Sequence, residues 1–318
     1  VLAITGLPYH DLARTDTPQD VDHTRLFQAV AAYSVALHGA QHVQGGVSLA
    51  CRTALARRGV AHVAIPVDVQ EQELAEDEPS PRHKVEPSTQ SAAATLQPDA
   101  AAITEAARIF NLGRRVVILA GQGARGAADE LLRTSELLGA PIAKALLGKD
   151  VVPDVHPAVT GGVGYLGARP SQQALAACDT LLIVGSGFPY VEYYPSPGQA
   201  KVVQIDSDPA RISLRYPVDA AIVGDARASL ARLNDALTMN TDHDFLKQVR
   251  QWKAEWLEAL AAGARRPGEP MKPQRVVYEL DRRLGDDALV ATDCGHNTGL
   301  AAQYLQIRGS QRFAVSGT

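Results

Sequence analysis

Residues 179–195 read DTLLIVGSGFPYVEYYP, and this stretch decides the fold that the sequence predicts. The apolar run at 181–184 is too short for a helix and has no polar face, which is typical of a strand buried on both sides in a parallel sheet. Two glycines, a phenylalanine and a proline end the run, and Tyr190, Tyr193 and Tyr194 follow. We interpret the tyrosines as packing or domain contacts, and the glycine turn as the place where a large, flat, partly polar ligand meets the strand.

The flanking sequence repeats this pattern of buried strand, turn and helix. Short apolar segments predict further strands at 114–120, 141–146, 201–208 and 220–225, and other segments predict helices at 99–110, 127–139, 170–178 and 226–237. Strands that are apolar throughout and alternate with helices indicate an α/β fold with a doubly wound parallel sheet. Residues 98–238 are therefore predicted to form a complete domain.

Two further units of the same build are predicted on either side of this domain. Residues 1–75 contain predicted strands at 1–4 and 59–66 and helical segments from about Thr24 and at 43–58. Residues 271–318 contain predicted helices at 273–284 and 299–307 and strands at 288–293 and 312–316. The connections are a linker at 76–97, rich in acids and prolines, and a connector at 239–270 with an amphipathic helix at 245–260. The prediction is thus three consecutive parallel-sheet units, of which only the central one is complete.

Composition narrows the classes of function. The 31 Lys and Arg residues and 35 Asp and Glu residues give a net charge of −4, so neither nucleic acid nor an anionic membrane surface is an expected partner. No apolar run is long enough to span a bilayer. The three cysteines lack CxxC spacing, which indicates reduced packing residues in a cytoplasmic protein. Because the sequence starts and stops beside predicted strands, we expect it to be an internal piece of a longer chain.

The hexapeptide GQGARG at 121–126 matches the GxGxxG pattern between a predicted strand and a predicted helix. Glycines at these positions let main-chain N–H groups approach a phosphate, and the guanidinium of Arg125 would pair with a pyrophosphate. The acid that usually binds a ribose at the end of the second strand is missing, since the next acid is Asp150, and this weakens a nicotinamide-dinucleotide interpretation. A tight strand–helix turn without any ligand is the alternative, and the sequence leaves it open.

Four other turns follow predicted strands of the same sheet. Residues 161–167 and 185–189 offer glycines for close main-chain approach, and Asp206, Asp208 and Asp225 offer carboxylates to sugar hydroxyls. Each acid is also a candidate helix cap. Because parallel strands end at the same edge, the turns are predicted to line that edge and to hold an extended dinucleotide. The nine histidines are scattered without a metal-binding or nucleophile pattern, so no metal site is predicted.

Together these segments resemble the thiamine diphosphate enzymes of the pyruvate oxidase and acetolactate synthase family, and the pyruvate oxidase branch most closely. The motifs that carry the resemblance run along the whole chain and include VLAITG, TPQDVDHTRLF, VAIPVDV, GQGARG, ALLGKDVVPDVHP, GGVGYLGARPS, KVVQIDSDPARI, VDAAIVGD and ATDCGHNT. The resemblance implies that 98–238 is a complete Rossmann-like (DHS-like) FAD-binding domain. It also implies thiamine-binding folds on both sides: the C-terminal part of a pyrimidine domain at 1–75 and the start of a diphosphate domain at 271–318.

The resemblance also assigns site residues. It places the glutamine of a catalytic loop beside thiamine at Gln19, although Pro18 and Asp20 replace the usual neighbours of that glutamine. The segment that borders the diphosphate is Asp293, Gly295, Asn297, Thr298 and Ser316. The implied FAD contacts are Gly121, Gly123, Arg125, Gly126, Val163, Gly164, Tyr165, Leu166, Gly185, Ser186, Gly187, Phe188, Pro189, Asp206, Asp208 and Asp225.

For the intact enzyme, the resemblance implies FAD and thiamine diphosphate with Mg²⁺ as cofactors, and oxidative decarboxylation of a small-molecule 2-oxo acid such as pyruvate in a homodimer or homotetramer. An acetolactate synthase-like carboligase is the alternative, and a non-catalytic nucleotide-binding module ranks third. The glutamate that activates thiamine and the segment that holds Mg²⁺ belong to parts of the family fold outside this sequence. The chain alone is therefore expected to be inactive in thiamine chemistry.

Overall fold

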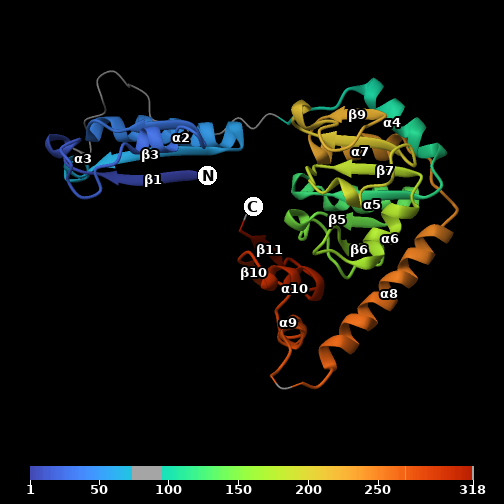
Figure 1. Ribbon diagram of the computed structural model, residues 1–318. Coiled ribbons are helices and arrows are strands. Elements are labelled where there is room, and N and C mark those ends of the chain that lie inside the picture. Colours follow the sequence, from blue (N-terminus) through green and yellow to red (C-terminus); the bar gives the residue numbers. More distant parts are fainter. Residues whose placement is uncertain (74–94, 269, 317–318) are drawn as a thin grey trace. The chain divides into compact units, whose positions relative to one another are not determined.

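The computed structural model describes residues 1–73, 95–268 and 270–316, and it divides the chain into two compact units, Val1–Ala94 and Thr95–Thr318 (Figure 1). Most of the predicted linker at 76–97 lies outside the described residues. Mixed α/β structure with parallel sheets, as the sequence predicts, is confirmed in both units.

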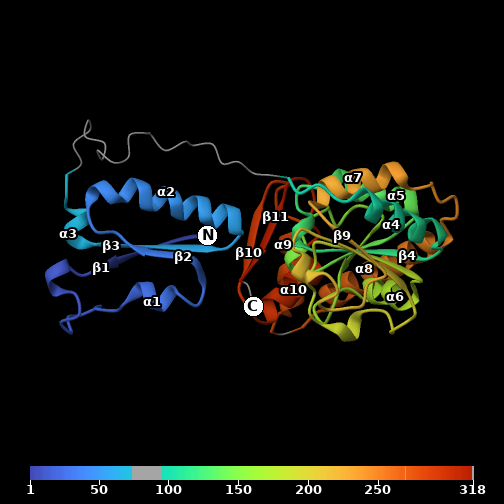
Figure 2. The same cartoon turned by 90° about the horizontal axis from the view of Figure 1, so that it is seen from above.

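The first unit is a three-stranded parallel sheet in the order β1-β3-β2, with α2 on one face and α1 on the other (Figure 2). Its core includes Leu37, Ala50 and Val63. The predicted helical stretch from Thr24 is wrong beyond Phe27, because the chain turns there and pairs as β2 with the central strand. The elements are β1 (Leu2–Leu7), α1 (His23–Phe27), β2 (Ala31–Ala36), α2 (Ala40–Arg57), β3 (Val60–Pro66) and α3 (Val67–Gln70).

The second unit contains a six-stranded parallel sheet in the order β6-β5-β4-β7-β8-β9. The order reverses between β4 and β7, whose residues are all buried, and this reversal is the switch point where open α/β sheets bind ligands. β6 was not predicted, because its four residues include two glycines and lie within an apparent loop. The strands are β4 (Val116–Ala120), β5 (Ile142–Lys144), β6 (Val159–Gly162), β7 (Thr180–Val184), β8 (Lys201–Asp206) and β9 (Ala220–Val223).

Helices cover both faces of this sheet (Figure 2). One face packs against α4 (Ala100–Leu112), α5 (Ala128–Leu138) and α7 (Ala226–Ala236). The other face packs against α6 (Arg169–Ala177) and the start of α8 (Asp244–Arg265), the helix predicted within the connector. Single 3₁₀ turns lie at His10–Leu12, Gln122–Ala124, Leu146–Gly148, Val191–Tyr193 and Pro209–Arg211.

The C-terminal segment, residues 270–316, adds a small parallel pair of strands to the second unit. It comprises α9 (Pro273–Asp281), β10 (Leu289–Thr292), α10 (His296–Tyr304) and β11 (Arg312–Val315), close to the predicted bounds. Ile307 and Phe313 are buried in its core, and the partly buried Leu146 of the central domain packs against this core. Among the described residues, no helix is long and apolar enough to cross a membrane.

Candidate functional site

The turns that the sequence singles out follow the carboxyl ends of neighbouring parallel strands. Residues 121–126 follow β4, 163–167 follow β6, 185–189 follow β7, 206–208 close β8 and 224–225 follow β9. Since every pair in the sheet is parallel, all five turns lie at one edge, which we call the carboxyl edge. The structure thus brings the turns together as expected, while their contact with FAD stays a prediction.

The glycines at the switch point are required by contact between two main chains. A Cβ atom built on Gly121 would lie 2.3 Å from the carbonyl oxygen of Gly185, and one on Gly123 would lie 2.8 Å from its Cα. Gly185 itself has a φ of +54°, and its oxygen accepts a 3.0 Å hydrogen bond from the Gly123 N–H. This close packing accounts for Gly121 and Gly123 without a ligand, as the tight-turn interpretation proposed.

Arg125 is engaged by other groups of the protein. Its guanidinium forms an ion pair of 2.9 Å with Asp150 and donates a 3.0 Å hydrogen bond to the carbonyl oxygen of Leu147. The Asp150 side chain is only 1% exposed, and Arg312 also pairs with it at 3.1 Å. In the sequence, Asp150 stands out only as an acid that lies too far beyond the second strand to bind a ribose. Nothing in the GQGARG motif indicates that it is the partner of Arg125.

The turns after β6 and β7 keep free main-chain donors at the carboxyl edge. Within the described part of the second unit, the N–H groups of Gly164, Tyr165, Ser186 and Gly187 donate no hydrogen bond to the protein. Gly164 has a φ of +93°, and the Tyr165 side chain is 84% exposed. These turns therefore present polar donors and an exposed aromatic ring, which fit an extended ligand with phosphate or carbonyl oxygens.

The aromatic residues after β7 mostly pack among themselves. The buried Phe188 ring lies 5.8 Å from Tyr194 and 5.6 Å, edge-on, from Tyr190. The hydroxyl of Tyr194 donates a 3.0 Å hydrogen bond to the Phe188 carbonyl oxygen, and burial raises the pKa of Tyr194 to about 12. The interpretation of the tyrosines as packing residues is confirmed for Tyr194, whereas half of Tyr190 is exposed.

The three acids at strand ends act as caps of local turns. Asp225 accepts a hydrogen bond from the Ala228 N–H and caps α7, and Asp208 likewise accepts from Ala210. One oxygen of Asp206 accepts from the Asp208 N–H at 3.0 Å. The cap alternative is therefore confirmed for Asp208 and Asp225. A carboxylate has two oxygens, so a cap leaves acceptor capacity for a sugar hydroxyl.

The residues predicted to border a diphosphate lie together at the carboxyl ends of β10 and β11. The Asp293 carboxylate accepts hydrogen bonds from the Cys294 N–H at 2.7 Å and from the Ser316 hydroxyl at 3.0 Å, and these bonds lower the pKa of Asp293. The Thr298 hydroxyl donates to the Asp293 carbonyl oxygen. Gly295, with a φ of +118°, begins α10, and Asn297 in its first turn is exposed. Among the described residues, no group of three or more His, Cys, Asp and Glu is placed to hold a metal.

Gln19 lies in an exposed loop of the first unit with a φ of +66°. Arg14 and Asp16, in the same loop, also have positive φ values of 63° and 62°, an unusual density for residues other than glycine. Asp22 fastens the loop, because it accepts 2.6 Å hydrogen bonds from the Thr24 hydroxyl and from Arg14. The hydrogen bond from Thr24 is the main reason that the pKa of Asp22 is lowered to about 2.

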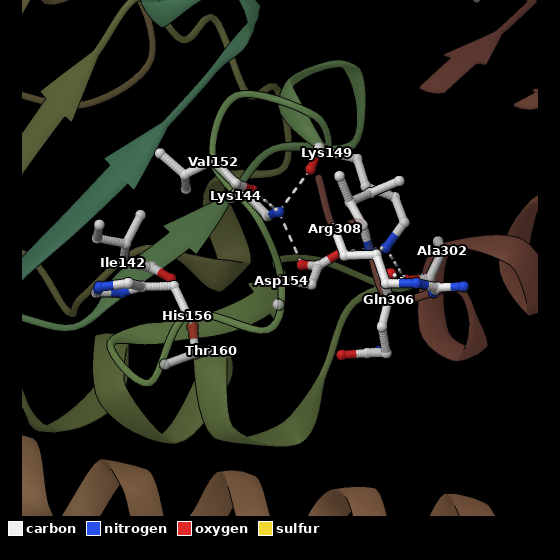
Figure 3. Close-up of polar contacts among 12 residues, drawn as sticks. Ile142, Lys144, Lys149, Val152, Asp154, His156, Thr160, Ala302, Gln306 and Arg308 are labelled. Atoms are coloured by element: carbon white, nitrogen blue, oxygen red, sulfur yellow. Dashed lines mark hydrogen bonds and ion pairs between the residues drawn. The ribbon is translucent and has the colours of Figure 1, made fainter. Parts of the chain in front are cut away.

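One buried ion cluster escaped the sequence prediction (Figure 3). Asp154, in the loop between β5 and β6, pairs with Lys144 at 2.7 Å and with Lys149 at 3.0 Å, and all three side chains are nearly inaccessible. Burial lowers the pKa of Lys144 to about 8. Burial also works to raise the pKa of Asp154, but the two lysines outweigh it and lower the pKa to about 2. The only signal in the sequence is a lysine inside the apolar strand PIAKAL.

A depression of about 570 Å³ lies at the opposite end of the sheet, at the amino ends of β7 and β8. Asp179, Lys201 and Asp219 line it. Lys201 pairs with Asp219 at 2.6 Å, and Asp179 accepts hydrogen bonds from the main chain of Arg115. Each of these three charged groups thus has a partner, Lys201 with Asp219 and Asp179 with Arg115, so they do not form a set of converging free groups.

Comparison with known proteins gives a consistent picture. Residues 103–233 match the family model described as thiamine pyrophosphate enzyme, central domain. The chain is 32% identical over 316 residues, 99% of its length and 54% of the relative's, to "Putative thiamine pyrophosphate-containing protein YdaP" of Bacillus subtilis. It is 27% identical to pyruvate oxidase of Lactiplantibacillus plantarum, over 99% of the chain and 52% of that enzyme. It is 28% identical to the acetolactate synthase large subunit of Corynebacterium glutamicum, over 100% of the chain and 51% of that subunit. The chain thus spans about half the length of the relatives that it matches.

Proposed function

We propose that this chain is part of a thiamine diphosphate-dependent enzyme that acts on a 2-oxo acid, because residues 103–233 match the model of the thiamine pyrophosphate enzyme central domain. Relatives named pyruvate oxidase and acetolactate synthase match essentially the whole chain, including the segments on both sides of the central domain. The observation that carries the proposal is that these relatives align with the chain continuously, through the central domain and the segments on both sides of it. A homodimer or homotetramer is part of the same proposal.

Within that enzyme we propose that the carboxyl edge of the central sheet holds FAD. The free N–H groups of Gly164, Tyr165, Ser186 and Gly187 support the proposal, because flavin and pyrophosphate oxygens accept such hydrogen bonds. Asp206, with one oxygen used in its turn, would accept from a ribityl or ribose hydroxyl. Gly121, Gly123 and Arg125 would shape the edge through protein contacts and make no bond to the flavin.

The C-terminal segment would border the diphosphate of thiamine, with Mg²⁺ held by parts of the enzyme outside this sequence. Bound thiamine diphosphate supplies the carbanion that adds to a keto carbon and permits loss of CO₂. In this chain the start of α10 at Gly295 offers main-chain N–H groups, and a helix start favours a nearby anion. The Asp293–Ser316 and Thr298–Asp293 hydrogen bonds hold that turn in shape. Gln19 is proposed as the glutamine of the loop beside the cofactor.

Flavin reduction in the intact enzyme tests the proposal. The enzyme, loaded with thiamine diphosphate, Mg²⁺ and FAD without oxygen, is expected to release CO₂ from pyruvate and to lose its flavin absorbance. Omission of thiamine diphosphate is the control and should abolish both. No CO₂ from pyruvate or any other 2-oxo acid would contradict the enzyme class, and a colourless protein that takes up no FAD would contradict the flavin site alone.

An acetolactate synthase-like carboligase is the second candidate function, favoured by the match to the acetolactate synthase large subunit along the entire chain. The same anaerobic experiment separates the two activities. Acetolactate that forms from pyruvate while the flavin absorbance persists identifies the carboligase, because its flavin does no net redox work. Flavin bleaching with acetate or an acetyl product identifies the oxidase.

A further inference from the structure

The loop at 145–154, between β5 and β6, joins two regions that the proposed function uses, and we call it the docking loop. On one side it touches the carboxyl edge. A Cβ atom on Gly148 would lie 2.8 Å from the carbonyl carbon of Gly121, so the two main chains are in contact. Beside the loop, the carbonyl oxygen of Lys144 accepts a hydrogen bond from the Val163 N–H. The docking loop is thus fixed to the turns after β4 and β6.

On its other side the docking loop binds the carboxyl end of α10. Asp154 and Ile307 exchange two hydrogen bonds, of 2.7 Å from the Asp154 N–H and 3.0 Å from the Ile307 N–H to the Asp154 carboxylate. Lys149 donates a 3.0 Å hydrogen bond to the carbonyl oxygen of Ala302, in the last turn of α10. A cation at this end of a helix is favourable, because the helix dipole is negative there.

The docking loop also binds β11. The Asp150 carboxylate pairs with Arg312 at 3.1 Å and accepts a long hydrogen bond, 3.4 Å, from the Phe313 N–H. Arg125 bridges the two regions, because it pairs with Asp150 and also reaches the Phe313 carbonyl oxygen at 3.5 Å. β11 leads directly to Ser316, and Thr298 lies in the first turn of α10.

We infer that Asp154 and Asp150 are positioning residues that dock α10 and β11 onto the central domain and so set the diphosphate border relative to the carboxyl edge. Buried charges must find partners. The loop charges pair with one another and with Lys144 and Arg125 on the central-domain side, and their remaining bonds go across the contact to Ile307, Ala302 and Arg312. The inference rests on the proposed function only for the role of the docked segment. The docking itself depends on contacts within this chain.

Hydrogen exchange of main-chain amides in the full chain, without cofactors, tests the docking. Asp154→Asn removes the charge that holds Lys144 and Lys149, and we expect exchange in α10 and at 305–307 to become at least tenfold faster while β4 and β7 stay protected. Lys149→Met keeps most of the apolar side chain and removes the ammonium group together with its hydrogen bond to Ala302, and it should have a smaller effect in the same places. If Asp154→Asn fails to fold, the exchange rates of Lys149→Met in α10 and at 305–307 test the docking in its place.

The double variant separates charge pairing from packing. If Lys149 and Asp154 act through one ion pair, Lys149→Met should add little to the effect of Asp154→Asn, whereas two independent packing effects would multiply. Asp219→Asn is the matched control, because Asp219 also has a lysine partner at 2.6 Å but lies at the opposite end of the sheet. It should leave exchange at 296–316 unchanged.

Unchanged exchange at 296–316 in Asp154→Asn and Lys149→Met would overturn the inference, whereas multiplying effects in the double variant would support docking through two separate bonds, from Asp154 to Ile307 and from Lys149 to Ala302. These outcomes are independent of the proposed function. A chain that passes the exchange test and takes up no FAD contradicts the flavin proposal alone. A chain that binds FAD while its C-terminal segment is insensitive to both substitutions contradicts the docking alone.

Discussion

Arg125 and Asp150 form an ion pair of 2.9 Å, and the aspartate side chain is 1% exposed. Arg125 lies in a stretch that matches a phosphate-binding motif, and Asp150 lies in the docking loop that contacts β11. The ion pair therefore holds the Arg125 side chain against β11 of the C-terminal segment. Arg125 could bind a ligand or hold the C-terminal segment, and the two roles predict different effects of its substitution. Loss of a ligand contact would weaken FAD binding, whereas loss of the ion pair would lower stability.

We expect Arg125→Gln to act on stability and to spare flavin binding. Loss of an ion pair with a buried carboxylate should lower the free energy of unfolding by about 1 to 3 kcal/mol, measured by urea denaturation. The dissociation constant of FAD, measured by fluorescence titration, should change by less than about threefold, below 1 kcal/mol. A large loss of FAD affinity at unchanged stability would show that Arg125 is a ligand of the flavin.

Gly123→Ala should destabilise the central domain. The new Cβ atom would lie 2.8 Å from the Cα of Gly185, a main-chain atom that cannot move aside alone, so the free energy of unfolding should fall by about 3 kcal/mol. Gly45→Ala is the control with the opposite sign. Gly45 lies within α2 with nothing near its Cβ position, and alanine there should stabilise the first unit by about 0.5 to 1 kcal/mol. Equal effects in thermal unfolding would contradict the packing role of Gly123.

Asp154 should make the second unit sensitive to acid. Its pKa is about 2 in the folded protein and 3.8 in an unfolded chain, so its contribution is complete above pH 3.8 and is lost as the pH falls through 2. The contribution is about 2 kcal/mol. The difference in unfolding free energy between the wild type and Asp154→Asn should therefore shrink between pH 4 and pH 2. A difference that is constant over this range would contradict the lowered pKa.

Lys144 should make the second unit more stable as the pH rises through the alkaline range. Its folded pKa of about 8 is below the ordinary value of 10.5, so between these values the unfolded chain binds more protons and stability rises with pH. Burial is the main cause, because the cost of the buried charge disappears when the lysine is neutral. Urea titrations from pH 7.5 to 10 should show the wild type gaining stability relative to Lys144→Met. The opposite slope would mean that the pair with Asp154 outweighs burial.

Tyr165→Ala tests the carboxyl edge without disturbing the fold. Because 84% of the side chain is exposed, its loss should change the free energy of unfolding by less than about 0.5 kcal/mol. If the ring stacks on the flavin or the adenine, FAD affinity should fall about tenfold. Leu112→Ala, an exposed residue at the end of α4, is the control and should leave FAD affinity unchanged. Equal affinities in the wild type and Tyr165→Ala would remove Tyr165 from the proposed site.

The sequence by itself determined which segments are strands and helices wherever the pattern of apolar residues is strong. The runs of β4 and β7 could be read as buried strands because burial on both faces requires side chains that are apolar throughout. The same argument missed β2 and β6, since β6 has two glycines among four residues and β2 is defined by its pairing with β3.

Only the tertiary structure decided which residues meet. The contact of Gly123 with Gly185, the pair of Arg125 and Asp150, and the exchange between Asp154 and Ile307 join positions far apart in the chain. Hydrophobic periodicity is a local property, and it fixes whether a residue prefers burial. The partner of a buried charge depends on the path of the whole chain, and so the role of Arg125 became visible only in the folded molecule.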